Sequence, residues 1–321
     1  MFDLHRLRLL RELKHRGTLS AVASALSYSP STISQQLSQL ESEAGVPLLE
    51  PVGRRVRLTP QAEILVAHTE VVLERLDRAR AEILASISEP AATVHIAAFQ
   101  SALLSLVPQA LELLRNEYPL LRIQVVQMGR QDGVSALLNG DCDVAIDVEY
   151  PGISVPRPSE IEREALGEDT LQLAVTNKAG AAASETLGSL SSYPWVMAPE
   201  GTDARQWAVA LCREAGFEPD VRYESSDLLV HLRLVEHGHA AAFLPSLMWR
   251  GWLPTVPLQR LPPHQQVRTL ATIVRRGASR NPAIQAVRQA LSRAHAYKSS
   301  SGVLLPIPNQ RPNARSGLSE G

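Results

Sequence analysis

Three aspartates stand close together in this 321-residue sequence, at Asp141, Asp143 and Asp147. Carboxylates grouped in this way could bind a metal ion or act as a general acid and base. Asp143 and Asp147 lie four residues apart on an expected strand and so share one of its faces, but Asp141 follows a glycine in a turn. We interpret them as one turn acid and two strand acids rather than as a catalytic or metal site.

Histidines and cysteines offer the other reactive side chains. His231, His237 and His239 span an expected helix end, and no cysteine or pair of acids completes a four-ligand zinc site. Cys142 and Cys212 could form a redox switch, but they lie in different expected lobes, and we interpret them as buried structural thiols. No Ser-His-Asp order, phosphate-binding loop or dinucleotide-binding glycine motif occurs in a suitable context. We therefore expect no enzymatic activity, no cofactor and no metal.

A different chemistry is suggested by the stretch SPSTISQQLSQLE, residues 29–41, in which only the last polar residue is charged. Glutamine amides and Ser or Thr hydroxyls can both donate and accept hydrogen bonds, as the reading of base edges requires. Free N–H groups at a helix N-terminus also favour phosphate. The residues expected to contact DNA are Ser29, Pro30, Ser31, Thr32, Ser34, Gln35 and Gln36. We expect Gln35 and Thr32 on bases and Ser31 and Ser34 on phosphates; the alternative is a merely solvated polar helix.

Three short helices must position this stretch. Residues 4–16 carry leucines at helical spacing, and Thr18 or Ser20 can cap a second helix. Ser29 is a suitable N-cap for the third helix, with a proline at its first position. The spacing of apolar residues predicts that this helix buries Ile33, Leu37 and Leu40.

A small hairpin is expected to follow. VPLLE at 46–50 and RVRLT at 55–59 read as strands around Pro51-Val52-Gly53. Arg54 and Arg55 at its turn can reach phosphates or a narrow minor groove; the alternative is ordinary surface arginines. Residues 1–58 hold eight Lys and Arg against five acids. This surplus of three is compatible with a nucleic-acid module but is weak evidence alone.

Residues 59 to about 88 are expected to form one long helix, opened by Thr59-Pro60. Its apolar residues step by four, three and four, and a helix of this length has nothing of its own to bury them against. We therefore expect a partner helix from a second chain to cover the seam. The seam residues are Val72, Leu76, Ala79 and Ile83.

After Pro90 the pattern changes to alternating strands and helices, which predicts an α/β body with mostly parallel sheets. The expected strands are 93–98, 121–127, 143–148, 170–176, 194–198, 221–224, 240–244 and 267–275. The expected helices are 102–117, 132–139, 203–215, 227–237 and 281–296. Pro/Gly-rich spacers near 151–158 and 254–264 suggest crossings between two subdomains.

With these elements assigned, the run TLSAVASALSYSPSTISQQLSQLESEAGVPLLE, followed by GRRVRLTP, resembles the winged helix-turn-helix of the LysR-type transcriptional regulators. ALLNGDCDVAI, MAPEGT and LVEHGHAAAFLP match the family's effector-binding domain at lower specificity. The resemblance covers about 1–297. It departs at Glu50-Pro51-Val52, where relatives commonly have a basic residue after Glu, and at Ala62, where Gly is usual.

The resemblance implies a two-lobed, periplasmic-binding-protein-like domain that binds a small-molecule effector between its lobes. Such binders place ligands near strand C-terminal ends and helix N-termini. The expected effector residues are Phe99, Gln100, Ser101, Met128, Asp147, Gly201, Thr202 and Phe243. Simple helix capping by Ser101 and Thr202 is the alternative, and no arginine pair stands out as a clamp for a dicarboxylate.

We therefore expect an α/β protein with an N-terminal all-α winged helix-turn-helix. The expected parts are a DNA-binding domain at 1–58, a dimerisation helix at 59–88, an effector domain at 91–297 and a disordered tail at 298–321. The two lobes would span about 91–165 plus 266–297, and 166–265. The resemblance implies a DNA-binding regulator that binds an interrupted inverted repeat of double-stranded DNA as a homodimer through the linker helix, or as a homotetramer. The alternative is a solute-binding module with an N-terminal protein-assembly domain.

Two cysteines do not indicate a secreted disulfide framework, and no apolar run is long enough to span a bilayer. We therefore expect a soluble cytoplasmic protein with no membrane partner.

Overall fold

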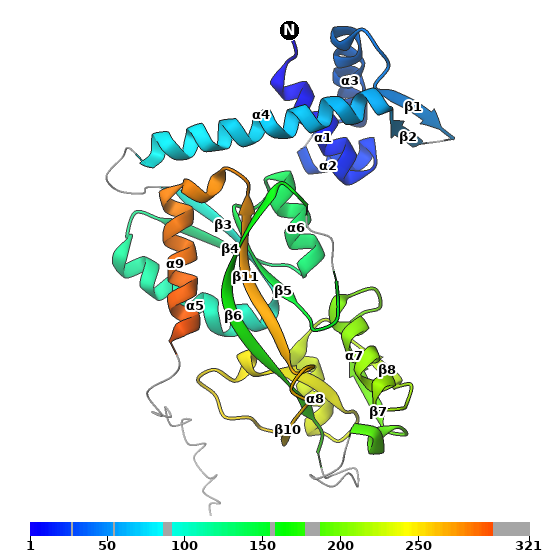
Figure 1. Ribbon diagram of the computed structural model, residues 1–321, viewed down its shortest axis with the longest axis vertical. Helices are drawn as coiled ribbons and strands as arrows, with labels where there is room; N and C mark the ends of the chain where they lie inside the picture. The colour runs from blue at the N-terminus through cyan, green and yellow to red at the C-terminus, as the bar shows by residue number, and fades with distance from the viewer. Residues whose placement is uncertain (27, 54, 86–91, 155–157, 177–186, 298–321) are drawn as a thin grey trace, which may run out of the picture.

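The computed structural model describes residues 1–26, 28–53, 55–85, 92–154, 158–176 and 187–297. Three helices open the chain, followed by a hairpin and one long helix (Figure 1). Their bounds are α1 (Leu4–Arg16), α2 (Leu19–Leu26), α3 (Pro30–Ala44), β1 (Leu49–Val52), β2 (Arg55–Leu58) and α4 (Pro60–Ala85). This order confirms the predicted winged helix-turn-helix and linker helix.

Helix α3 begins and ends as its sequence predicts. The Ser29 hydroxyl accepts a hydrogen bond from the Thr32 N–H at 3.1 Å, with Pro30 in the first turn. Gly45 ends the helix in the left-handed region, where a residue without Cβ is least strained. Ile33, Leu37 and Leu40 are at most 1% exposed and pack with the leucines of α1. The buried stripe is therefore confirmed, and it turns the polar face outward.

The first strand of the hairpin lies further along the chain than predicted, at Leu49–Val52 instead of 46–50. Leu49 pairs with Leu58 and Val52 with Arg55, so Pro51 and Val52 belong to the strand instead of the turn. The turn forms around Gly53, whose φ of 62° suits a tight reversal. Proline is tolerated in β1 because this two-stranded sheet leaves each strand with an open edge.

Helix α4 has two different faces. Thr59 caps it by accepting from the Ala62 N–H at 3.2 Å. Leu73 and Ala81 are buried, whereas the predicted seam of Val72, Leu76, Ala79 and Ile83 is exposed in this single chain. Figure 1 shows α4 lying across one end of the body. The predicted end of this helix, near residue 88, lies outside the described residues.

The body is built on a seven-stranded mixed sheet with strand order β10-β6-β11-β5-β3-β4, and β9 also pairs with β6. Its strands are β3 (Thr93–Ala98), β4 (Arg122–Gln127), β5 (Val144–Glu149), β6 (Ile161–Ala174), β9 (Ala242–Pro245), β10 (Leu258–Arg260) and β11 (Val267–Arg275). Strand β3 is parallel to β4 and β5, but β11 is antiparallel to β5 and β6. The expectation of mostly parallel sheets is therefore wrong, because β11 reverses the chain direction in the middle of the sheet.

Separate sets of hydrophobic cores define two lobes of the body. Lobe I surrounds the core of β3, β5, α5 (Gln100–Glu117) and α9 (Pro282–Ala296), with α6 (Arg130–Asn139) beside it. Lobe II surrounds the cores of β9 and of the parallel pair β7 (Pro194–Met197) and β8 (Asp220–Glu224). Its helices are α7 (Asp203–Glu214) and α8 (Leu228–Glu236).

Strand β6 joins the two lobes. Residues 161–170 of β6 pair with β11, and residues 171–174 pair with β9 and β10. The crossing suggested near 151–158 is therefore made by this strand, whose first half was not predicted. A second difference is β10, which lies inside the spacer expected at 254–264. The tail at 298–321, predicted to be disordered, lies outside the described residues. Within the described ranges, no helix has the length and apolarity needed to cross a bilayer.

Candidate functional site

The polar face of α3 is the first candidate site. Ser31, Ser34 and Gln35 are exposed on the side of the helix away from its buried stripe. Thr32 is half-buried, and its hydroxyl lies 2.8 Å from that of Ser29. Gln36 also has a partner within the protein, because its Oε1 accepts a hydrogen bond from the Arg6 Nε at 3.1 Å. Of the residues predicted to contact DNA, Ser34 and Gln35 therefore have the side chains that are most available for hydrogen bonds to DNA.

Most of the basic residues that give the N-terminal segment its positive surplus are paired within the protein. Arg6 pairs with Glu43, Lys14 with Glu63 at 3.0 Å and Arg57 with Glu50 at 2.6 Å. Arg11 and Arg16 both pair with the buried Glu12. The side chains of Arg54 and Arg55 lie outside the described part of the chain. These five cations are therefore already engaged within the protein and are less available to attract phosphate.

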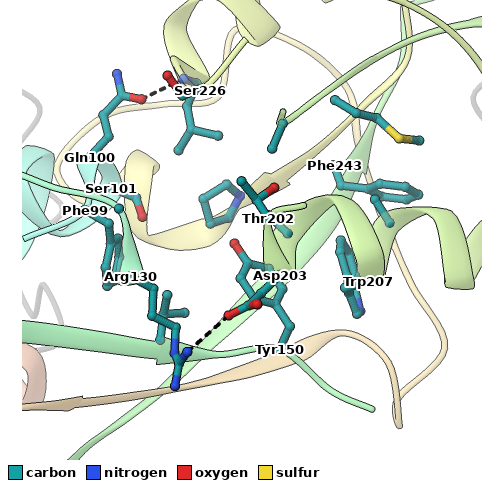
Figure 2. Close-up of a pocket in the computed structure, with 18 of the residues that line it drawn as sticks. Phe99, Gln100, Ser101, Arg130, Tyr150, Thr202, Asp203, Trp207, Ser226 and Phe243 are labelled. Carbon is teal, nitrogen blue, oxygen red and sulfur yellow. Dashed lines mark hydrogen bonds and ion pairs between the residues drawn. The ribbon is translucent and has the colours of Figure 1, made fainter. Parts of the chain in front are cut away.

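The second candidate site is a cavity of about 270 Å³ between the two lobes. Aromatic side chains form much of its wall, with the Tyr150 and Trp207 rings 5.7 Å apart and the Trp207 and Phe243 rings 5.1 Å apart. Figure 2 shows residues from both lobes facing the cavity. Such a wall suits an apolar or aromatic body.

Five of the eight residues predicted to bind an effector line this cavity, and three do not. The lining residues are Phe99, Gln100, Ser101, Thr202 and Phe243. Asp147 points away because side chains alternate along β5, and Val148 lines the cavity in its place. Met128 packs against the small core beside α6 and Gly201 lies outside the lining. Ser101 and Thr202 have different roles, since Thr202 caps α7, whereas Ser101 lies inside α5, whose N-cap residue Phe99 makes no side-chain cap hydrogen bond.

Two arginines of the cavity were missed by the sequence reasoning. Arg268 of β11 is 3% exposed and forms an ion pair with Asp169, in which Nη2 lies 2.7 Å from Oδ2. Its Nη2 donates to the Ser101 hydroxyl at 2.7 Å, which leaves the Ser101 O–H proton free for another acceptor. Arg130, the first residue of α6, lies between the lobes. Its Nε is 2.9 Å from Asp147 Oδ1 and its Nη1 is 3.5 Å from Asp203 Oδ2 of lobe II (Figure 2).

The pKa values of the reactive groups follow from burial. Burial raises the pKa of Asp147, and the nearby Arg130 opposes this shift. Burial lowers the pKa of His231, a cavity residue whose Nε2 lies 2.8 Å from the Ser225 carbonyl oxygen, so this imidazole is neutral at pH 7. Burial raises the pKa of Cys142 and of Cys212 to about 12. Neither thiol is therefore a reactive thiolate at physiological pH.

The carboxylates considered as a cluster are placed apart. Asp141 pairs with Arg16, Asp143 accepts from the His95 N–H, and Asp147 pairs with Arg130. In the described part of the chain, one group of three side chains brings its ligand atoms within 4.8 Å of one another: His15, Glu70 and Glu160. These residues come from α1, α4 and the position before β6. Because they lie far apart in the sequence, no local pattern predicts that they are neighbours.

Comparison with known proteins agrees with this architecture. The family model described as "Bacterial regulatory helix-turn-helix protein, lysR family" matches residues 4–63, and "LysR substrate binding domain" matches residues 88–296. The chain is 28% identical over 245 residues to the transcriptional dual regulator GltC of Bacillus subtilis, covering 76% of this chain and 80% of that protein. It is 26% identical over 248 residues to a hydrogen peroxide-inducible genes activator of Dickeya chrysanthemi, covering 76% and 78%.

Solved structures share the fold. A full-length OxyR variant from Pseudomonas aeruginosa matches with a TM-score of 0.63 at 22% identity, over 91% of this chain and 95% of that one. Full-length CbnR in complex with its target DNA matches with a TM-score of 0.52 at 21% identity, over 91% and 100%.

The fold and the cavity together define a DNA-binding regulator with a two-lobed effector domain. The chain belongs to the LysR family of transcriptional regulators, as the resemblance predicted. It is a DNA-binding transcriptional regulator that senses a small-molecule effector. This assignment favours a regulator over the alternative of a solute-binding module with an assembly domain.

Proposed function

We propose that this regulator binds duplex DNA through α3 and the β1–β2 hairpin as a dimer formed along α4. The proposed parts are residues 1–58 for DNA, 59–88 for dimerisation and 91–297 for the effector. The exposed seam on α4 supports the dimer, since Leu76 and Ile83 are 43% and 66% exposed in one chain. A second copy of the helix would bury this seam, and pairing of two such dimers would make a tetramer.

The effector is proposed to be a small carboxylate, or a similar anion, with an apolar or aromatic body. The observation that carries this proposal is the N-terminus of α5 at the cavity. It has neither a side-chain cap nor an acidic residue in its first turn, whereas Thr202 caps α7 and Asp227 caps α8. Uncapped helix N-termini attract anions through their free N–H groups.

The group beside this N-terminus favours the same chemistry. Ser101 can donate its hydroxyl proton to the anion while its oxygen accepts from Arg268. Trp207 and Phe243 on the opposite lobe would then cover the apolar body. A ligand held by both lobes stabilises their closed arrangement, which is how an effector could change the placement of the DNA-binding domains.

Sensing of peroxide by a cysteine is not favoured, although several relatives are named peroxide-inducible activators. Cys142 lies in the small core beside α6 and Cys212 lies in the core of lobe II. Both thiols are buried and carry a raised pKa of about 12, so they lack the thiolate that reacts with peroxide.

Thermal unfolding of the full chain tests the effector proposal. A panel of aromatic and branched aliphatic carboxylates is compared with the matching neutral amides, since binding to the folded state raises the unfolding temperature. A stabilising acid should bind Ser101→Ala about tenfold more weakly, because one charge-assisted hydrogen bond is lost. Ser192→Ala, an exposed serine outside the cavity, is the control. Equal stabilisation by acids and amides would contradict the proposed anion site.

Duplex DNA from the region upstream of the chain's own gene tests the DNA-binding face. Gln35→Ala should lose discrimination at one base position, whereas Gln61→Ala, an exposed glutamine on α4, should bind as the wild type does. Binding should weaken steeply with salt, because phosphate contacts release counterions. Unchanged base preference in Gln35→Ala would show that α3 docks differently.

A further inference from the structure

Helix α6 connects the effector cavity to the DNA-binding domain within one chain. It has ten residues, so it spans about 15 Å. One end carries Arg130 at the cavity, and the other end contacts α1 (Figure 1 shows α6 between the sheet and the N-terminal helices). Ala136 and Leu137 pack it against β3 and β5 in the core that also contains Ala97 and Ala145. Such a packed helix moves as a rigid unit.

The cavity end of α6 responds to the position of lobe II. The Arg130 side chain is 10% exposed and lies between Asp147 of lobe I and Asp203 of lobe II, at N–O distances of 2.9 and 3.5 Å. Asp203 is the first residue of α7, whose neighbours line the cavity. Any separation of the lobes therefore breaks the Arg130–Asp203 ion pair and changes the force on the start of α6.

The other end of α6 is bound by arginines of α1. Arg11 Nη2 donates to the Leu138 carbonyl oxygen at 2.7 Å, and Arg16 Nη2 lies 3.2 Å from Asp141 Oδ2 just beyond the helix. The last carbonyl groups of a helix lack partners within the helix and carry its negative dipole, so a guanidinium suits this position. Buried Glu12 pairs with both arginines and holds them toward α6.

A third arginine joins the linker helix to the same place. Arg275 Nη1 donates to the Leu137 carbonyl oxygen at 3.0 Å, while its Nε lies 3.3 Å from Asp77 Oδ2 of α4. The end of α6 is therefore one point at which the DNA-binding domain, the linker helix and lobe I meet.

We propose that α6 transmits the state of the effector cavity to the DNA-binding domain of the same chain. Arg130 is the positioning residue at the cavity, and Arg11 and Arg16 are the positioning residues at the junction. Opening of the lobes releases Arg130 from Asp203, and the displaced helix weakens the contact with α1. This inference rests on the proposed function in that it takes the cavity to be the effector site.

Distances between spin labels in the full chain test the proposal without DNA or effector. Labels on Ser42→Cys of α3 and Ser292→Cys of α9, both exposed positions, report the placement of the DNA-binding domain on the body. Labelled chains are mixed with excess unlabelled protein so that distances between subunits do not contribute. A chain without the added cysteines checks that the buried Cys142 and Cys212 stay unlabelled.

Weakening either end of α6 should change the same distance. Arg11→Gln, and Asp141→Asn as a milder change at an exposed carboxylate, should add a longer-distance population, with the docked-to-undocked ratio falling about tenfold for Arg11→Gln. Asp203→Asn should shift the ratio in the same direction. In the Arg11→Gln background, Asp203→Asn should add nothing, because the junction through which it acts is already broken. Arg213→Gln, on the exposed face of α7, is the control and should leave the distances unchanged.

Two results would overturn the proposal. If Arg11→Gln and Asp141→Asn both keep the wild-type distances, the contact with α1 does not hold the domain. If they undock the domain but Asp203→Asn does not, α6 does not transmit from the cavity. Failure of the effector proposal is seen separately, since it would leave these distances as expected while no carboxylate raised the unfolding temperature.

Discussion

The side-chain amide of Gln100 in lobe I reaches across the cavity to Asp227 in lobe II. Its Nε2 donates to Asp227 Oδ1 at 2.6 Å, and its Oε1 accepts from the Leu228 N–H at 2.6 Å. Asp227 is the N-cap of α8, and this contact lowers the pKa of its carboxyl. One glutamine at the start of α5 thus completes the cap of a helix in the other lobe, which holds the lobes closed.

Gln100→Ala should loosen this closure. The Leu228 N–H loses its acceptor, so its hydrogen exchange should become about fivefold faster, as expected for the loss of a hydrogen bond worth about 1 kcal/mol. Exchange measured by mass spectrometry over the start of α8 checks this. Gln124→Ala on the exposed side of β4 is the control. Unchanged exchange at α8 would mean that the Gln100 contact does not hold the lobes.

Gly277→Ala should detach α4 from lobe I. A Cβ at Gly277 would lie 2.6 Å from the Glu74 carbonyl oxygen of α4, and the residue has a φ of +88°. Gly251→Ala, with a φ of +79° and open space around it, has the same backbone strain without the clash. The unfolding temperature should therefore fall further for Gly277→Ala, by the equivalent of roughly 1–3 kcal/mol. Equal losses in the two variants would show that this close approach is unimportant.

Glu70→Gln should stabilise the protein at neutral pH. Burial and the neighbouring Glu160 raise the pKa of Glu70, while the pKa of Glu160 is lowered, as in a pair that shares one proton held by Glu70. The protonated Glu70 carboxyl therefore contributes its full share of the folded state's stability below the unfolded pKa of 4.5. This contribution is lost as the pH rises through the raised pKa of the folded state.

The gain in unfolding temperature of Glu70→Gln should therefore grow as pH rises above 4.5 and vanish below it. Glu82→Gln on the same helix, whose exposed carboxylate pairs with Arg280, should show no such gain. A gain for Glu70→Gln that is independent of pH would argue against repulsion between Glu70 and Glu160.

Both native thiols should resist alkylation and peroxide in the folded protein. At a pKa of about 12, roughly one thiol in ten thousand is ionised at pH 8. Mass spectrometry after iodoacetamide treatment should find Cys142 and Cys212 modified only in denaturant, whereas the exposed Ser42→Cys reacts in the native state. Rapid modification of either cysteine in the folded protein would contradict this prediction and favour redox sensing by that thiol.

Much of the local structure could be predicted because its signals are local. Ser29, Gly45 and the stripe of Ile33, Leu37 and Leu40 determine where α3 begins and ends and which face it buries. The first half of β6 was missed because its residues are mostly polar and partly exposed, so no alternation of apolar residues predicts a strand. The same locality explains why five of the eight residues predicted from strand ends and helix starts line the cavity.

The sequence by itself determined the family, the polar face of α3, the exposed seam of α4 and the positions at which strands end near a cavity. Only the tertiary structure decided which charges meet. Arg268 reaches Ser101, Arg130 reaches Asp203, and Arg11 reaches the end of α6 across separations of 167, 73 and 127 residues. Hydrophobic periodicity is a property of neighbouring residues, whereas an ion pair depends on the path of the whole chain, and no local pattern contains that path.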